Sequence, residues 1–236
     1  MLESIYSFCH TMSMKIICIG QEKGGVGKST LTGNLAVALA HQNQRVIIID
    51  SDRQQTCMKW GSRRQLAGVE PKIDFASLLA NPSDLGSYIK TIRGVGESGR
   101  YDACLIDVGG RDTPELRGAM GLAHVLVAPC LPSQPDIESL AEFETKVSEA
   151  LAFNPDLRHV VVFNRAPAGL FAGEAQAAVQ AFGEMTIFGP PVASITDRPT
   201  YRDSWARGQG VYDLEPKTGS AAAKSQAELS GLLEAL

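Results

Sequence analysis

A glycine-rich segment with two lysines and two hydroxyl side chains follows an apolar run near the start of the chain. The run covers residues 16–19, and residues 21–30 read Gln-Glu-Lys-Gly-Gly-Val-Gly-Lys-Ser-Thr. A strand that ends in such a loop and continues into a helix directs several backbone N–H groups and the positive end of the helix at one point. A polyphosphate suits that arrangement, so we expect a nucleotide here.

Acidic side chains end two later apolar runs. Asp50 and Asp52 follow one run, and Asp107 follows another, directly before Gly109 and Gly110. Ligands of parallel sheets bind beyond the carboxyl ends of the strands, so we expect these carboxylates beside the phosphates. Carboxylates and phosphates repel each other unless a divalent cation lies between them. Mg²⁺ suits such a site, because it takes few direct protein ligands. A helix N-cap or a solvated loop is the alternative for each acid alone.

The elements that must position these residues follow from the hydrophobic pattern. Continuous Val, Ile and Leu runs alternate with helical patterns, which predicts an α/β fold: a doubly wound, mostly parallel sheet with helices on both faces. The strands are expected at residues 15–20, 45–50, 101–108, 124–129 and 158–164, and the helices at 29–41, 136–153 and 171–182.

Length and composition predict one enzyme-sized domain over residues 14–236. The chain has 236 residues, 44% of them hydrophobic and 20% charged, as in ordinary globular proteins. Residues 1–13 precede the first convincing strand, and we expect an N-terminal extension with little structure there.

Several functional classes are disfavoured by composition. The formal charge of -4 argues against coating nucleic acid through bulk charge, although a local basic face on a dimer stays possible. The five cysteines lack C-x-x-C spacing and are interpreted as reduced and structural. The sequence contains neither an apolar stretch of about eighteen residues nor a signal-peptide pattern, so we expect a cytoplasmic protein.

The glycine-rich loop departs from the G-x-x-x-x-G-K-[ST] pattern, because Glu22 occupies the position of the first glycine and Lys23 follows it. This variant resembles the deviant Walker A loop of the ParA/MinD family of P-loop ATPases. The resemblance covers the chain from Met14 onward and is strongest to small ParA-type (ParF-like) partition ATPases without an N-terminal DNA-binding extension. It implies the three-layer P-loop NTPase fold, hydrolysis of ATP with Mg²⁺, and dimerisation on ATP binding.

The resemblance also implies roles for residues of the loop. Lys28 binds the β and γ phosphates, Ser29 ligates Mg²⁺, and Thr30 lies near the α-phosphate. The signature lysine, Lys23, reaches the nucleotide of the other subunit in the dimer. Phosphoryl transfer needs positive charge on its oxygens, so a cation from a second subunit links hydrolysis to assembly. A solvated surface lysine is the alternative for Lys23. The implied loop contacts with the nucleotide are Gly24, Gly25, Val26, Gly27, Lys28, Ser29 and Thr30.

The Asp-x-Asp-Pro-Gln segment of the family corresponds to residues 50–54. By this resemblance Asp50 supports the metal shell and Asp52 orients the attacking water, while Asp107 takes the Walker B role. The implied metal set is Ser29, Asp50 and Asp107, and the implied catalytic set is Lys23, Lys28 and Asp52. Arg53 stands where proline is usual, which leaves the switching behaviour of this loop open.

The base is expected to be adenine. A guanine-reading Asn-Lys-x-Asp is absent, and the run at residues 160–163 ends instead in Asn164 and Arg165, which we assign to the nucleotide site. In related ATPases an asparagine at this strand end faces adenine. A simple turn at Asn164 is the alternative, because asparagine is common in turns.

Family members bind DNA non-specifically as ATP dimers and are stimulated by a ParB-like adaptor, which implies a nucleoid-associated partition or cargo-positioning protein. Arg198, Arg202 and Arg207 are the candidate DNA contacts. Asp197 and Asp203 lie between them, so a self-neutralising solvated helix face is the alternative.

Two further functions stay open. A MinD-like spatial regulator on membranes needs a basic amphipathic C-terminal helix, whereas residues 227–236 are acidic, so we expect no stable membrane binding. A P-loop ligase or kinase that acts on a small molecule is the second. A redox role like that of the nitrogenase iron protein is disfavoured, because Cys104 lies inside a strand and Cys130 lacks a fitting companion.

Overall fold

The computed structural model describes residues 14–80, 85–168 and 182–236. The expected N-terminal extension and nearly all of the helix expected at 171–182 lie outside the described residues. A seven-stranded sheet forms the centre of the molecule, in the order β3-β2-β4-β1-β5-β6-β7, and every neighbouring pair is parallel. The strands are β1 (Lys15–Ile19), β2 (Val46–Ser51), β3 (Asp74–Ser77), β4 (Ala103–Val108), β5 (Val125–Cys130), β6 (Arg158–Ala166) and β7 (Ala193–Thr196).

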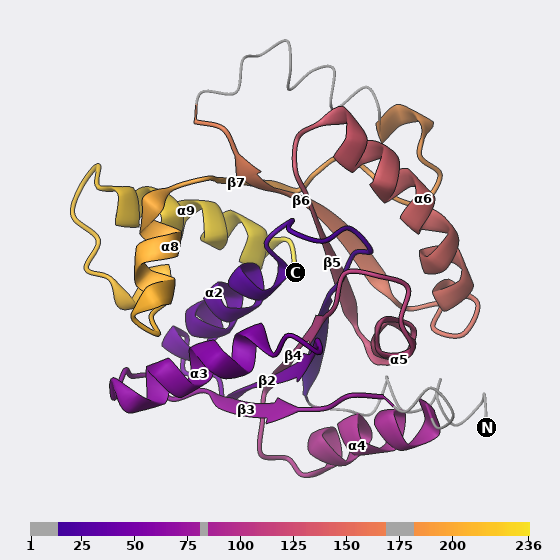
Figure 1. Cartoon of the computed structure of the whole chain (residues 1–236), viewed down its shortest axis with the longest axis horizontal. Coiled ribbons are helices and arrows are strands. Elements are labelled where there is room, and N and C mark those ends of the chain that lie inside the picture. The colour runs from indigo at the N-terminus through magenta and orange to yellow at the C-terminus, as the bar shows by residue number, and fades with distance from the viewer. Residues whose placement is uncertain (1–13, 81–84, 169–181) are drawn as a thin grey trace.

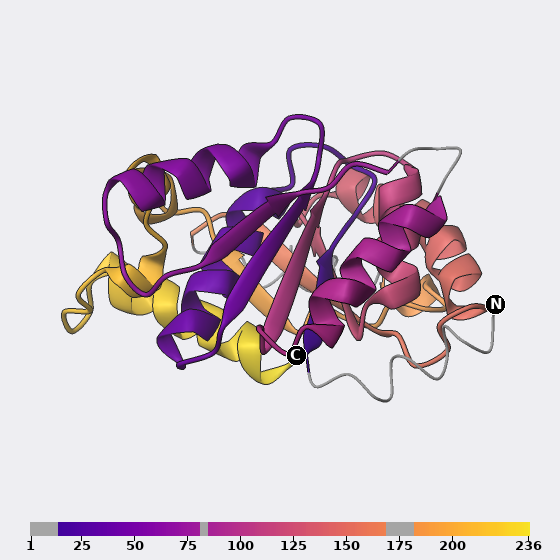
Figure 2. The same ribbon diagram turned by 90° about the horizontal axis from the view of Figure 1, so that it is seen from below.

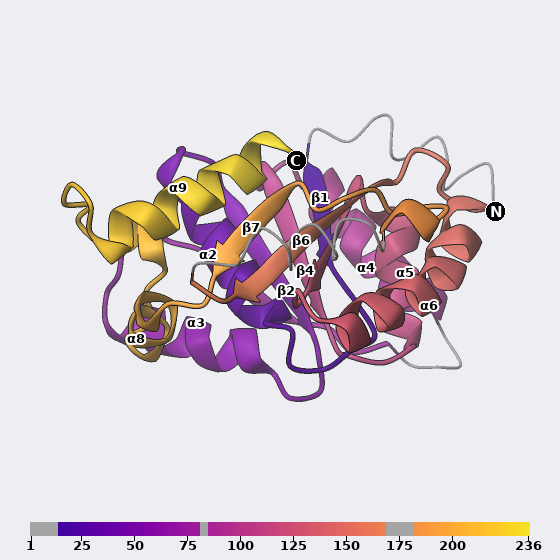
Figure 3. The same ribbon diagram turned by 90° about the horizontal axis from the view of Figure 1, so that it is seen from above.

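Helices cover both faces of the sheet (Figure 1). One face packs against α2 (Lys28–His41), α3 (Thr56–Leu66), α8 (Pro199–Ala206) and α9 (Ala221–Glu234). The other packs against α4 (Leu85–Glu97), α5 (Pro114–Leu122) and α6 (Gln134–Leu151). Two short 3₁₀ helices are η1 (Phe182–Glu184) and η2 (Val211–Asp213). The views from below and above show the same three layers (Figures 2 and 3). The predicted doubly wound α/β fold is confirmed.

The central strands explain the continuous apolar runs of the sequence. Every residue of β2, β4 and β5 is buried, because helices cover both of their faces. Alternate side chains enter the two separate cores, so neither face can be polar. None of the helices in the described part of the chain is long and apolar enough to cross a membrane.

The strand order creates a crevice at the carboxyl ends of β1 and β4. The connection after β1 crosses to β2 through α2, whereas the connection after β4 crosses in the opposite direction to β5 through α5. Ligands of doubly wound sheets bind at such a point of reversal. The same register aligns Ile19 and Asp50, on the flanking strands, with Asp107. The fold therefore brings the glycine-rich loop and both strand-end acids to one place.

Aromatic rings fasten α3 and α8 to α2. Trp60 stacks on Trp205, with ring centroids 4.7 Å apart and an interplanar angle of 6°. Gly33 of α2 admits this pair, since a Cβ there would lie 2.5 Å from a ring carbon of Trp205. Trp60 also meets the edge of Phe75 on β3. The outer helices of this face are thus held by shape as well as by burial.

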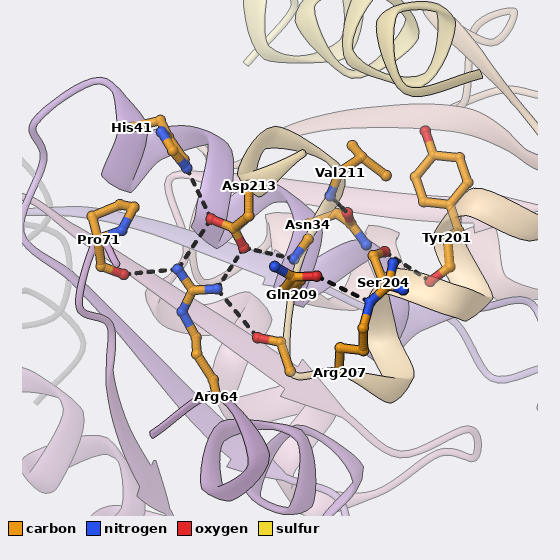
Figure 4. Close-up of polar contacts among 12 residues, drawn as sticks. Asn34, His41, Arg64, Pro71, Tyr201, Ser204, Arg207, Gln209, Val211 and Asp213 are labelled. Carbon is orange, nitrogen blue, oxygen red and sulfur yellow. Dashed lines mark hydrogen bonds and ion pairs between the residues drawn. The ribbon is translucent and has the colours of Figure 1, made fainter. Parts of the chain in front are cut away.

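A buried ion pair continues this attachment (Figure 4). Arg64 of α3 pairs with Asp213 of η2 at 2.6 Å, and both side chains are at most 3% exposed. Arg64 also donates to the carbonyls of Gly208 and Pro71, and Asp213 contacts His41 of α2. The other polar atoms of Arg64 and Asp213 are largely hydrogen-bonded, so the pair is stable in the interior. It holds α2, α3 and η2 together.

We expect Asp213→Asn to lower the free energy of unfolding by about 3 kcal/mol, because it leaves the Arg64 guanidinium buried without its counter-charge. Urea denaturation of the variant measures this loss. Asp203→Asn is the matched control: Asp203 is 56% exposed and pairs with a solvated Arg202, so the loss of its charge should leave the midpoint nearly unchanged. Equal midpoints for both variants would contradict a stabilising role for the buried pair.

Candidate functional site

The glycine-rich loop connects β1 to α2 in a conformation that depends on glycine. Gly25 and Gly27 have φ angles of 80° and 87°, which side-chain-bearing residues rarely adopt. Gly27 is the N-cap of α2, and a Cβ there would lie 2.5 Å from the amide nitrogen of Asn164. Neither a side-chain cap nor an acidic residue occupies the first turn of α2, so its backbone N–H groups are available to an anion.

Lys28 lies in the crevice between the loop and the residues after β4. Its side chain is buried, and its ammonium donates to the carbonyl of Lys23 at 2.9 Å. A Cβ on Gly110 would lie 2.9 Å from that nitrogen, so the loop after β4 passes directly beside it. Burial lowers the pKa of Lys28, and the negative charges of Asp107 and Asp52 oppose this shift.

Asp107 is a fully buried acid of the site. Burial raises the pKa of Asp107 to about 7, and the negative charge of Asp50 contributes in the same direction. A hydrogen bond from Ser29 opposes this shift. Thr32 and Cys57 also direct their side chains to this carboxylate, each at 3.3 Å. A buried carboxylate with a neighbouring hydroxyl and a second acid is a set of hard oxygen donors that fits Mg²⁺.

Asp50 is also fully buried, and both of its carboxylate oxygens accept backbone N–H groups. The donors are Asp52 at 3.1 Å and Met58 at 2.9 Å. Ligand atoms of Asp50, Cys57 and Asp107 lie within 4.8 Å of one another. Sequence reasoning missed Cys57, since an isolated cysteine at the start of a helix carries no signal of this neighbourhood. Asp50 thus shapes the loop after β2 while facing the expected metal position.

Asp52 occupies the rim of the crevice. Its carboxylate accepts the backbone N–H of Gln54 at 3.0 Å, which closes a tight turn before α3. A Cβ on Gly109 would lie 3.5 Å from the same carboxylate, so Asp52 faces the loop that follows β4. Arg53, which stands where the family pattern has proline, is exposed beside Asp52 and lines the pocket described below.

Lys23 turns away from the nucleotide loop of its own chain. Its ammonium pairs with Asp136 in the first turn of α6 at 3.1 Å, and its side chain is 33% exposed. The neighbouring Glu22 and Gly24, by contrast, line the pocket. Lys23 is thus a partly exposed lysine with a buried carboxylate as its partner, and its contact with a second subunit stays a prediction.

Asn164 and Arg165 brace the glycine-rich loop from β6. The amide nitrogen of Asn164 donates to the carbonyl of Val26 at 2.7 Å, and Arg165 donates to that of Gly25 at 3.2 Å. Arg165 has a φ of 53° at an irregularity in the pairing of β6 with β7, which turns its side chain toward the loop. Both residues line the pocket, so a contact with the base stays a prediction.

Lys28, Asp52, Asn164 and their neighbours line one pocket of about 1400 Å³, which exceeds the roughly 300–1000 Å³ of common small-molecule sites. The buried Asp50, Cys57 and Asp107 and the outward-turned Lys23 are not among the residues that line it. Its far wall comes from the segment after β7 and from α8, and includes Arg198 and Arg202. Each arginine proposed to contact DNA has a polar partner: Glu228 for Arg198, Asp203 for Arg202 and Gln209 for Arg207. Arg198 and Arg202 thus meet acids and Arg207 meets a neutral amide, and contact of the three with DNA stays a prediction.

Comparison with known proteins agrees with this geometry. A family model described as an AAA domain matches residues 14–93. The ParA protein of Rhizobium radiobacter is 24% identical over 213 residues, which cover 89% of this chain and 90% of that relative. The match therefore extends well beyond the glycine-rich loop.

Two solved structures have a similar fold. The septum site-determining protein MinD of Pyrococcus horikoshii, in complex with Mg-ADP, superposes with a TM-score of 0.65 at 21% identity, covering 92% of this chain and 94% of that one. A variant of Cyanothece McdA in complex with ATP gives a TM-score of 0.69 at 19% identity, covering 95% and 96%. With the deviant glycine-rich loop and the strand-end acids in place, the chain is similar to P-loop ATPases of the ParA/MinD type.

Proposed function

We propose that this ATPase is a dimerising switch that positions or segregates DNA or another cargo, binds DNA non-specifically as the ATP dimer, and is stimulated by a ParB-like adaptor. Its nucleotide is ATP and its metal is Mg²⁺. The observation that carries the proposal is the pair of lysines: Lys28 points into the pocket, while Lys23 points out of it toward α6. Two cations at one loop, directed to different places, suit a site completed by a second subunit.

The residues of the pocket take the following roles in this proposal. Lys28 and the N–H groups at the start of α2 bind the phosphates, and Thr30 lies beside the α-phosphate. Ser29 and Asp107 hold Mg²⁺, which neutralises charge on the phosphate oxygens. Both carboxylate oxygens of Asp50 already accept backbone N–H groups. Asp50 therefore supports the groups that surround the metal and is not its main ligand. Asp52, at the rim, orients the attacking water.

Lys23 makes hydrolysis depend on assembly. Within one chain its ammonium is held by Asp136, on the outer side of the loop. When two chains meet across their pockets, it leaves this carboxylate and contacts the phosphates of the partner's nucleotide. A cation from the other subunit adds positive charge at the phosphates only in the dimer. Hydrolysis therefore takes place only while the dimer persists.

The packing of the C-terminal helix favours cargo positioning over membrane regulation. Helix α9 buries Leu229 and Leu232 in the core against the sheet. A helix that uses its apolar face in the core does not present that face to a lipid surface. The ParA and McdA names belong to proteins that are similar to this chain, and they leave the cargo undefined.

The proposal is tested by the rate of ATP hydrolysis with and without non-specific duplex DNA and a candidate ParB-like adaptor. We expect slow turnover by the protein alone and at least about tenfold faster turnover with both, since dimer turnover rather than chemistry sets the rate. A turnover that neither DNA nor adaptor changes, and that a small-molecule acceptor accelerates, would favour a ligase or kinase.

Lys28→Ala is expected to weaken ATP binding about 10- to 100-fold, because it removes a charge-assisted contact from a buried phosphate site. Titration of a fluorescent ATP analogue measures the affinity. Lys217→Ala changes an exposed lysine outside the pocket and is the control. Equal affinities in the two variants would exclude Lys28 from phosphate binding.

Lys23→Ala is expected to bind ATP but to remain monomeric in size-exclusion chromatography with ATP and Mg²⁺, because the cross-subunit phosphate contact is missing. Asp136→Asn separates this role from the ion pair seen within one chain. It also breaks that pair but keeps the lysine, so it should still dimerise. Dimerisation of the Lys23 variant, or its loss in both variants, would remove the cross-subunit role.

Asp52→Ala is expected to trap the ATP dimer and to lower the hydrolysis rate about 100-fold, a usual effect for a group that positions or activates the nucleophile. The fraction of dimer after one hour with ATP, together with released phosphate, measures both effects. Wild-type hydrolysis in this variant would show that another group orients the water.

A further inference from the structure

The segment after β7 is fixed by one carboxylate of the C-terminal helix. Glu228 of α9 accepts the backbone N–H of Thr196 at 3.1 Å and its hydroxyl at 2.8 Å. The same carboxylate pairs with Arg198, and both side chains of that pair are about one-fifth exposed. Three donors from two residues, Thr196 and Arg198, therefore converge on Glu228.

A second contact, one turn away, holds the start of α8 to the same face of α9. The hydroxyl of Tyr201 donates to the carbonyl of Ser225 at 3.2 Å. Ser225 and Glu228 are three residues apart, so they lie on one side of the helix. Buried Leu229 and Leu232 anchor α9 in the core. The segment from Thr196 to Tyr201 thus rests on a rigid support.

This segment forms a wall of the nucleotide pocket. Asp197, Arg198 and Pro199 line the pocket on the side away from Asp52. Asp197 also faces Arg165 at 3.6 Å, which links this wall to the brace of the glycine-rich loop. Since the phosphates occupy the loop and the start of α2, this wall remains for the base and ribose.

We propose that Glu228 is a positioning residue that sets the wall at residues 197–199 against the nucleoside and thereby determines affinity for ATP without taking part in hydrolysis. The inference rests on the proposed ATP site. Removal of the carboxylate charge frees Arg198 and loosens the wall. The nucleoside contacts then weaken, while the phosphate contacts at Lys28 keep their geometry.

A matched control exists on the other side of β7. Glu144 of α6 accepts the backbone N–H groups of Thr186, Ile187 and Phe188 and the hydroxyl of Thr186. This carboxylate fixes the segment that precedes β7, much as Glu228 fixes the segment that follows it. Neither Glu144 nor the three residues it holds are among the described residues that line the pocket. Glu144→Gln therefore removes a carboxylate that holds a loop next to β7, but it leaves the pocket wall after β7 unchanged.

The test compares ATP with tripolyphosphate, both with Mg²⁺, by isothermal titration calorimetry. Glu228→Gln is expected to bind ATP about tenfold more weakly, the usual scale for losing a charged hydrogen-bond set. Its affinity for tripolyphosphate and its kcat at saturating ATP should stay within about twofold of the wild type, so that KM rises while kcat does not. Glu144→Gln should retain both affinities.

A second variant keeps the carboxylate and its pair with Arg198. Thr196→Val removes one donor only and should weaken ATP binding about threefold, whereas the double variant with Glu228→Gln should bind no more weakly than Glu228→Gln alone, because both act through one contact. Unchanged ATP affinity in Glu228→Gln, or equal losses for ATP and tripolyphosphate, would overturn the positioning role. A wild-type protein that binds tripolyphosphate but not ATP would instead overturn the proposed nucleotide.

Discussion

Two buried carboxylates on adjacent strands, close to a buried ammonium, form the charge arrangement on which the rest of the structure depends. Asp50 and Asp107 are aligned by the pairing of β2 with β4, and neither side chain is exposed. Such charges are stable inside a protein only when hydrogen bonds and opposite charges compensate them. Backbone donors, Ser29 and Lys28 provide that compensation in the free protein. Phosphate and a divalent cation extend the same balance of charge, so the pocket is organised before its ligand binds.

The pocket is held in place by elements distant in sequence, each through a small number of polar contacts. The glycine-rich loop is supported by Asn164 and Arg165 of β6, and the opposite wall by Glu228 of α9. The Arg64–Asp213 pair joins α3 to η2 and fixes the helix layer beneath α8. Rigid support of this kind suits the proposed switch, because movement would then be confined to the loops that line the pocket. The ion pair of Lys23 with Asp136 is more exposed by comparison, because the Lys23 side chain is 33% exposed.

The strands were predictable because burial on both faces leaves a continuous apolar signature. The runs before Asp50 and Asp107 correspond to β2 and β4 to within two residues of their observed bounds. The sequence analysis missed β3, at the edge of the sheet, because its exposed Asp74 and Ser77 interrupt any apolar run. It also missed α4, whose three glycines weaken a helical pattern that packing of Tyr88 and Ile92 nevertheless stabilises. Local pattern is therefore informative for the centre of the sheet and weak at its margins.

By itself the sequence determined the glycine-rich loop, the acids at the strand ends, and hence the fold class and nucleotide chemistry, because these depend on residues close together in the chain. Only the tertiary structure decided which distant side chains meet. It placed Cys57 against Asp107, paired Lys23 with Asp136, and neutralised Arg198 with Glu228. Each of these contacts joins residues at least thirty positions apart. Such partners are set by the packing of helices on a sheet, for which neighbouring residues carry no signal.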